Sequence, residues 1–124
     1  MNECCDFLVI GSGIAGLCFA IRASHFGKVV MITKKHDTES NTNYAQGGIA
    51  CVLDPQDCFE SHIRDTLITG KGLCKEEAVR ILVEEGPERI KELLQWGVNF
   101  SKSEKESNPL GLHLGKEGGH SVNR

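Results

Sequence analysis

The hydrophobic pattern opens with two short apolar runs on either side of a helical repeat. Residues 6–10 (DFLVI) are an apolar run that stops at Gly11, which is typical of a buried strand. In residues 14–26 apolar side chains recur at helical spacing, and Gly27 predicts the end of that helix. Residues 28–33 (KVVMIT) form a second, β-branched run. The pattern therefore predicts a strand, a helix and a parallel strand joined as a right-handed βαβ unit.

Helical periodicity returns after Pro55. Asp57 and Glu60 have the spacing of a capping box at the start of one helix. A second helix is predicted from Glu76, and Gly86-Pro87 predicts its end and the start of a third. Because only two strands precede these helices, we predict an α/β fold with a partial doubly wound parallel sheet. A complete sheet of that kind needs more strands, so the chain is expected to be a fragment of a larger protein.

Composition and charge exclude several classes of protein. Apolar residues make up 40% of the 124 residues and charged residues 25%, as in an average soluble domain. A net charge of −3 gives no electrostatic argument for nucleic acid as a partner. No apolar stretch approaches the ~20 residues that span a bilayer, and no signal peptide is recognisable, so we expect a cytoplasmic protein without a membrane partner. The six cysteines show no metal-ligand spacing and are expected to be reduced, partly buried thiols, with no metal bound.

The first candidate site is a glycine fingerprint, G-x-G-x-x-G, between the first predicted strand and the helix. Its three glycines allow a tight turn, a close approach of backbone to a pyrophosphate, and close packing of helix on strand. The start of the helix adds N–H groups and the positive end of a dipole. In this strand–turn–helix context the motif predicts dinucleotide binding by Gly11, Ser12, Gly13, Ile14, Ala15 and Gly16.

One part of the usual dinucleotide site is altered. An acidic residue is expected about 20 positions further on, at the end of the second strand, to bind the adenosine ribose. Thr33 and Lys34 occupy that place. A hydroxyl can still exchange hydrogen bonds with a ribose, so we keep both residues as cofactor ligands. The change disfavours an ordinary NAD-dependent dehydrogenase.

The long polar segment of residues 34–53 is the second candidate site. It exceeds the ~12–15 residues beyond which an irregular loop is usually functional or disordered. Within it, residues 40–50 read SNTNYAQGGIA, which follows Thr33-Lys34 in the order typical of one flavoprotein family. The chain here resembles the succinate dehydrogenase/fumarate reductase/L-aspartate oxidase family, in which this loop wraps the flavin. The resemblance implies FAD contacts from Asn41, Thr42, Asn43, Tyr44, Ala45, Gln46, Gly47 and Gly48.

Asn41 separates two branches of that family. In membrane-bound succinate dehydrogenases and fumarate reductases the matching residue is a histidine that bonds covalently to the flavin. Asparagine cannot form that bond, so the resemblance implies FAD held non-covalently.

The third candidate site lies at residues 112–121, LHLGKEGGHS. This segment resembles the substrate-side segment of the L-aspartate oxidase branch, where the glutamate faces the amino group of the substrate. The resemblance assigns Glu117 the orientation of the substrate, although by composition alone it would be a solvated surface charge. His113 and His120 are expected to orient the loop or to lie at its surface.

The resemblance implies the first part of an FAD-binding domain, over residues 1–124, of an enzyme that oxidises L-aspartate to iminoaspartate. Oxygen or fumarate would accept the electrons, and quinolinate synthase would consume the product in NAD biosynthesis. Two alternatives remain: a soluble fumarate reductase or succinate dehydrogenase flavoprotein, and a non-catalytic nucleotide-binding module.

Overall fold

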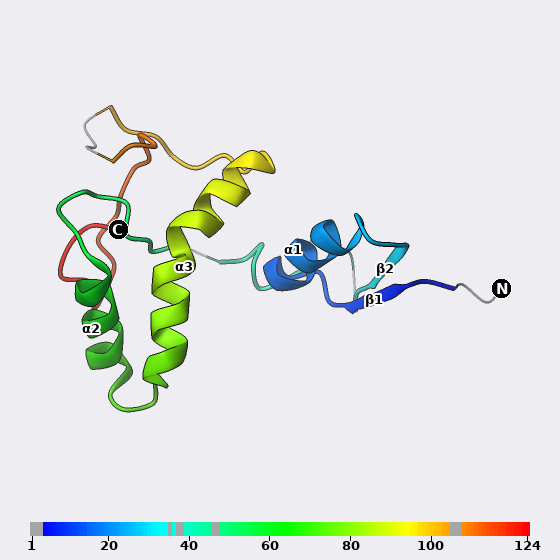
Figure 1. Cartoon of the computed structure of the whole chain (residues 1–124), viewed down its shortest axis with the longest axis horizontal. Helices are drawn as coiled ribbons and strands as arrows, with labels where there is room; N and C mark the ends of the chain where they lie inside the picture. Colours follow the sequence, from blue (N-terminus) through cyan, green and yellow to red (C-terminus); the bar gives the residue numbers. More distant parts are fainter. Residues whose placement is uncertain (1–3, 35, 37–38, 46–47, 105–107) are drawn as a thin grey trace. The chain divides into compact units, whose positions relative to one another are not determined.

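The structure is a computed structural model that describes residues 4–34, 36, 39–45, 48–104 and 108–124. The chain divides into two compact units, Met1–Gly47 and Gly48–Arg124. Figure 1 colours the first unit from blue to cyan and the second from green to red. Each unit is described by itself.

The first unit is the predicted βαβ motif. Strand β1 (Phe7–Ile10) leads through the glycine turn into helix α1 (Ile14–Ala23), and strand β2 (Val29–Ile32) follows. The two strands are parallel and in register from the Phe7–Val29 pair to the Ile10–Ile32 pair, and α1 packs against both. The prediction of strand, helix and parallel strand is confirmed, with β1 one residue shorter at its start and β2 one residue shorter at each end.

Helix α1 ends three residues before the predicted end at Phe26. The N–H groups of His25 and Phe26 bond to carbonyls three residues back, which tightens the chain into turns after Ala23. Gly27 serves another purpose, because a Cβ there would overlap the Asp6 side chain. The Asp6 carboxylate accepts the Lys28 N–H at 2.7 Å, so Gly27 admits a carboxylate that joins the start of β1 to the start of β2.

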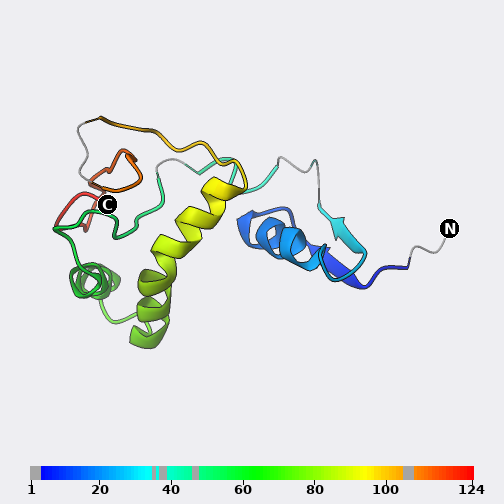
Figure 2. The same ribbon diagram turned by 45° about the horizontal axis from the view of Figure 1, so that its top comes forward.

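The second unit is built on two packed helices, α2 (Phe59–Gly70) and α3 (Glu76–Gln95). Ile63 of α2 lies with Val79 and Val83 of α3 in one buried cluster. A second cluster joins Ile90 of α3 to Cys51 and Leu112. Figure 2 shows α2 and α3 side by side.

The predicted break at Gly86-Pro87 is wrong, since α3 runs through both residues as one helix of 20 residues. A proline inside a helix removes one hydrogen bond to the carbonyl four residues earlier. Val83 and Ile90, on either side, are only 2% and 4% exposed. Burial of both halves of the helix outweighs the single lost bond.

The predicted capping box at the start of α2 is also wrong. The N-cap residue is Cys58, and no side chain caps it. The Asp57 carboxylate instead receives Nε of Arg124 at 2.7 Å and Nη2 at 3.0 Å. A two-pronged contact between a carboxylate and a guanidinium is stronger than a single bond from a backbone N–H, so Asp57 binds Arg124 instead of capping the helix.

The described residues 97–104 and 108–124 are mostly irregular but are bonded to one another and to the rest of the unit. Lys102 and Leu112 form an antiparallel bridge, and the Asn108 amide donates to the Leu112 carbonyl at 2.7 Å and accepts its N–H at 3.1 Å. These bonds hold Leu112 in the core. No helix among the described residues has the length and apolar content needed to cross a membrane.

The cysteines differ in exposure, and all six are free thiols. Cys51 is buried, and burial raises the pKa of its thiol to about 11, so it packs as a small neutral hydrophobe. Cys4, Cys5 and Cys58 are exposed, so the expectation of partial burial is wrong for these three.

Candidate functional site

The glycine turn between β1 and α1 depends on Gly11 and Gly16. Gly11 has φ +106°, in the region that favours glycine, and its N–H bonds to the Ile32 carbonyl at 2.8 Å. A Cβ on Gly16 would overlap the Gly11 carbonyl oxygen and press on the Val9 side chain. These two glycines therefore let the turn and the helix start pack together.

Gly13 leaves the helix start open. It is the N-cap residue of α1 and, having no side chain, forms no cap hydrogen bond of its own. A Cβ on Gly13 would meet only the Thr42 hydroxyl, at 3.7 Å, which is an ordinary contact. The absent side chain therefore leaves a cradle above the first N–H groups of α1, where a phosphate would be favoured.

The predicted flavin loop is anchored over this cradle. The Ile14 N–H, the first of α1, donates to the Thr42 hydroxyl at 3.1 Å. The loop is folded on itself, because the Asn43 N–H bonds to the Ser40 hydroxyl at 3.2 Å and the Ala45 N–H to the Thr42 carbonyl at 3.3 Å. Two segments far apart in sequence thus meet at the start of one helix.

The end of β2 meets the same turn. The Thr33 hydroxyl lies 3.2 Å from the hydroxyl of Ser12, which is buried. Thr33 itself is exposed. The altered strand end therefore supports the glycine turn and still presents a hydroxyl to solvent.

These elements enclose one open pocket of about 510 Å³ in the first unit. The predicted ligands that line it are Gly11, Ser12, Gly13, Thr33, Lys34, Asn41, Thr42 and Tyr44, with Ser40 beside them. Glu39 also lines the pocket and was missed. The motif places an acid at the strand end, whereas Glu39 follows six positions later along the chain. Its only sequence signal was an acid within the loop.

The remaining predicted ligands lie elsewhere. Ile14, Ala15 and Gly16 belong to α1, where Gly16 serves packing. Asn43 and Ala45 are exposed on the folded loop, and Gly48 belongs to the second unit. Gln46 and Gly47 lie outside the described residues.

The residues of this pocket fit a dinucleotide. The N-terminus of α1 and the Lys34 ammonium suit a pyrophosphate. Hydroxyls from Thr33, Ser40 and Thr42 and the Glu39 carboxylate suit ribose and other polar groups. The open cradle at Gly13 is the feature that a dinucleotide would fill.

The third predicted site lies in the second unit. Glu117 is exposed and begins a turn in which the His120 N–H bonds to the Glu117 carbonyl at 3.1 Å. Gly119 has φ +91°, and a Cβ there would overlap the Thr69 side chain of α2. The Glu117 turn therefore lies directly against α2. His113 is exposed.

A buried ionic network joins this segment to α2. The Asp65 carboxylate accepts the Ser121 N–H at 2.8 Å, the Ser121 hydroxyl at 2.7 Å and Nη1 of Arg124 at 2.7 Å. Hydrogen bonds from Arg124 and Ser121 hold the pKa of Asp65 well below its usual range. Burial alone would lower the pKa of Arg124, but the hydrogen bonds to Asp57 and Asp65 outweigh it and raise that pKa. The sequence pattern did not predict this network, because Asp65 was only one polar position of α2 and nothing linked Ser121 or Arg124 to it.

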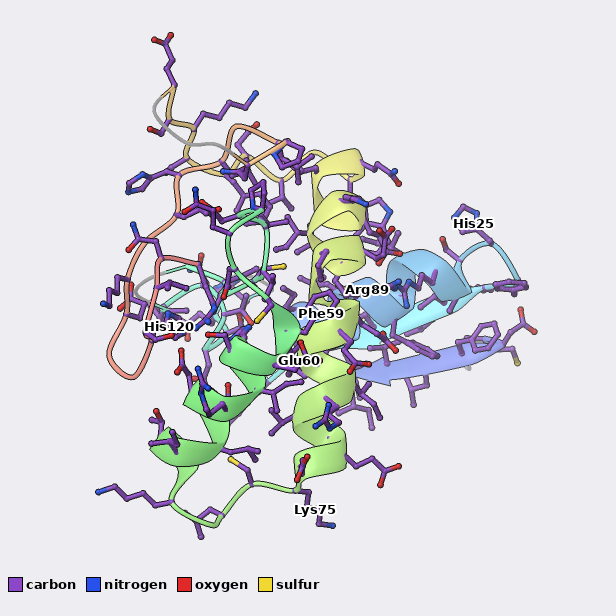
Figure 3. The ribbon with its side chains drawn as sticks, turned by 60° about the vertical axis from the view of Figure 1, so that its left-hand side comes forward. His25, Phe59, Glu60, Lys75, Arg89 and His120 are labelled. Atoms are coloured by element: carbon purple, nitrogen blue, oxygen red, sulfur yellow. The ribbon has the colours of Figure 1, made fainter. Side chains whose placement is uncertain are left out.

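His62 and His120 connect the same two segments. Their rings meet edge to face with centroids 5.7 Å apart, and Figure 3 shows His120 beside the first turns of α2, where Phe59 and Glu60 are labelled. His62 is 5% exposed, and its pKa is lowered first by burial and then by electrostatic interaction with Arg124 and His120. Asp57 and Asp65 oppose that shift. His62 is therefore held neutral. Within the described part of the chain, no group of three or more potential ligands could hold a metal ion.

Known proteins place this arrangement in a family. The chain is 54% identical over 119 residues to "L-aspartate oxidase, chloroplastic" of rice (Oryza sativa subsp. japonica), covering 96% of this chain and 18% of the rice protein. It is 48% identical to "L-aspartate oxidase" of Vibrio cholerae, covering 97% of this chain and 23% of that protein. The chain thus spans about a fifth of the length of these curated relatives.

Solved structures agree with the sequence relatives. Mycobacterium smegmatis Sdh1 in complex with UQ1 matches with a TM-score of 0.84 and 29% identity, over 97% of this chain and 20% of that one. A variant of E. coli quinol fumarate reductase FrdA matches with a TM-score of 0.84 and 32% identity, over the same shares. The predicted resemblance and α/β fold are confirmed. The sequence model of the family described as FAD binding domain matches residues 6–124, and the chain therefore belongs to the FAD binding domain family.

Proposed function

We propose that residues 1–124 are the first part of the FAD-binding domain of an L-aspartate oxidase, which converts L-aspartate to iminoaspartate. The observation that carries this proposal is the level of identity. The chain is 48–54% identical to L-aspartate oxidases over almost its whole length, but 29–32% identical to the Sdh1 and FrdA structures. The higher identity favours an L-aspartate oxidase over a succinate dehydrogenase or fumarate reductase flavoprotein.

The pocket of the first unit would hold the FAD. When bound, FAD supplies the acceptor for the hydride that leaves the substrate Cα. The glycine turn and the N-terminus of α1 would bind its pyrophosphate, with Lys34 adding positive charge. Thr33 and Glu39 would form hydrogen bonds with ribose hydroxyls, and residues 40–45 would contact the flavin side.

Asn41 supports a non-covalent cofactor. It lines the pocket and is exposed there, so its amide is available to a bound group. An amide has no ring nitrogen that could attack the flavin, and it offers only hydrogen bonds.

Glu117 would hold the substrate amino group. Its exposed carboxylate favours a substrate that carries an ammonium group and disfavours a dicarboxylate of the same shape that lacks one. Fumarate and succinate lack the amino group, so Glu117 separates the two enzyme readings.

The test replaces Glu117 by glutamine in the full-length protein. A charge-assisted hydrogen bond is worth about 1.5–3 kcal/mol, so kcat/KM for L-aspartate should fall roughly 10- to 150-fold. Fumarate reduction should be unchanged or improved, since a nearby negative charge is removed. Glu85→Gln, an exposed glutamate of α3, is the matched control and should leave both activities unchanged.

Equal losses for aspartate and fumarate in Glu117→Gln would contradict the role given to Glu117. A wild-type protein active on succinate and inactive on aspartate would support the soluble fumarate reductase or succinate dehydrogenase reading. A protein that binds FAD and turns over neither substrate would be a nucleotide-binding module.

The proposed activity also implies partners. Oxygen or fumarate would accept the electrons, and quinolinate synthase would consume the product. We retain the cytoplasm as the expected compartment, although the rice relative is named chloroplastic.

A further inference from the structure

We propose that Asp65 is a positioning residue for this reaction, which fixes the turn that carries Glu117 through Ser121 and Arg124. The inference rests on the proposed function and assigns a role to the buried network beside the site.

Helix α2 uses two faces for different contacts. Ser61, Asp65 and Thr69 follow one another at i, i+4 spacing and share one face of the helix. Ser61 accepts Nη2 of Arg124 at 3.0 Å, Asp65 binds Ser121 and Arg124, and Thr69 lies against Gly119. This polar face is used for the segment that carries Glu117, whereas Ile63 and Leu67 pack toward α3.

Hydrogen bonds hold the turn on both sides of Glu117. The Arg124 N–H bonds to the Gly115 carbonyl at 2.8 Å, and the Gly115 N–H returns to the Arg124 carbonyl at 3.2 Å. Gly115 precedes Glu117 and Ser121 follows it, and both tethers lead to Asp65, directly or through Arg124. Asp65 is thus the common anchor of the loop that presents the exposed carboxylate.

The residues that anchor the turn are buried. The Arg124 side chain is 0% exposed, and the side chains of Asp57 and Asp65 are 3% and 10% exposed. A buried carboxylate with three donors resists rearrangement, because no water replaces a lost bond without cost. Asp65→Asn keeps the size of the side chain and one acceptor oxygen but removes the negative charge, so the bonds from Ser121 and Arg124 weaken and the turn is held less firmly.

The experiment is a double-mutant cycle in the full-length, FAD-loaded protein, with wild type, Asp65→Asn, Glu117→Gln and the double variant. Because small misplacements of an orienting group cost large factors, Asp65→Asn should lower kcat/KM for aspartate roughly 10- to 100-fold. Fumarate reduction and flavin content should stay within about twofold, as expected for a group acting only through Glu117. In the Glu117→Gln background, Asp65→Asn should cost little more, since the group that it positions is already gone.

Asp54→Asn is the matched control, because Asp54 accepts the Gln56 N–H at 2.8 Å in a local turn that asparagine also supports. Ser121→Ala is the second variant, for the case in which Asp65→Asn does not fold. It removes one hydroxyl donor and leaves the ion pair, and it should give a smaller loss for aspartate alone.

Additive losses in the cycle, or equal losses for aspartate and fumarate in Asp65→Asn, would overturn the inference. If Asp65→Asn does not fold, an unchanged aspartate rate in Ser121→Ala would overturn it too. The role of Glu117 in the proposed function is tested separately: it is contradicted if Glu117→Gln changes the activities on aspartate and fumarate equally.

Discussion

At the scale of single residues, two glycines of one motif perform different tasks. Gly16 is where helix and turn touch, since a Cβ would overlap the Gly11 carbonyl. Gly13 has open space around it, bounded only by the Thr42 hydroxyl at 3.7 Å. The motif alone marks both positions as glycine, and the structure separates packing from binding.

The same substitution should therefore affect stability at one site and FAD affinity at the other. Gly16→Ala should lower the stability of the full-length apoprotein by about 1–3 kcal/mol, as overpacking does. Gly13→Ala should leave apoprotein stability unchanged and reduce FAD affinity, because the methyl group fills the cradle. Thermal unfolding of the apoproteins and flavin titration measure the two effects. Normal flavin affinity in Gly13→Ala would argue against a pyrophosphate at this turn.

Asn41 gives a second prediction at this scale. Because an amide cannot form the covalent bond, acid precipitation of the yellow full-length holoprotein should release the flavin into the supernatant. Absorbance of supernatant and pellet measures the partition. Flavin that stays with the precipitated polypeptide would contradict non-covalent binding.

At the scale of elements, α2 is the part of the second unit with two uses. Its apolar face, with Ile63, packs on α3, and its polar face holds residues 115–124. The apolar face was readable from helical periodicity. The polar face was not, because Ser, His and Asp at helical spacing are equally typical of a solvated surface.

His62 makes this element sensitive to pH. Its pKa is lowered in the fold, so the unfolded chain binds more protons below the usual histidine value of about 6.5. Stability should therefore fall as pH drops from 7.5 to 5.5, and His62→Gln should reduce that dependence. Asp65 does not interfere, because its contribution is lost only below the usual carboxyl range. Thermal unfolding of both full-length proteins across this range checks the sign, and identical slopes would contradict it.

At the scale of the whole molecule, the first unit is a partial sheet. Leu8, Ile10 and Ile32 on its two strands are 55%, 78% and 47% exposed. Parallel sheets normally have both faces covered, and a two-stranded sheet is marginal by itself. This agrees with the predicted partial doubly wound sheet and with the share of about a fifth that the chain covers of its relatives. That the two units form one FAD-binding domain stays a prediction.

The sequence by itself determined the elements and motifs that depend on near neighbours. The βαβ order follows from local periodicity, and the glycine turn follows from residues within six positions of one another. The order of Thr33-Lys34, Ser40-Asn41-Thr42 and the Glu117 segment was enough to recognise the family.

Tertiary structure alone decided which long-range partner each polar group takes. Asp57 has the spacing of a cap and binds Arg124 instead, 67 positions away. Pro87 has the spacing of a helix break, and the burial of Val83 and Ile90 carries α3 through it. Thr42, by sequence one hydroxyl among many, accepts the first N–H of α1. Local signals rank the conformations open to a short segment, but the free energy of a buried ion pair or a packed core is larger and depends on residues far along the chain.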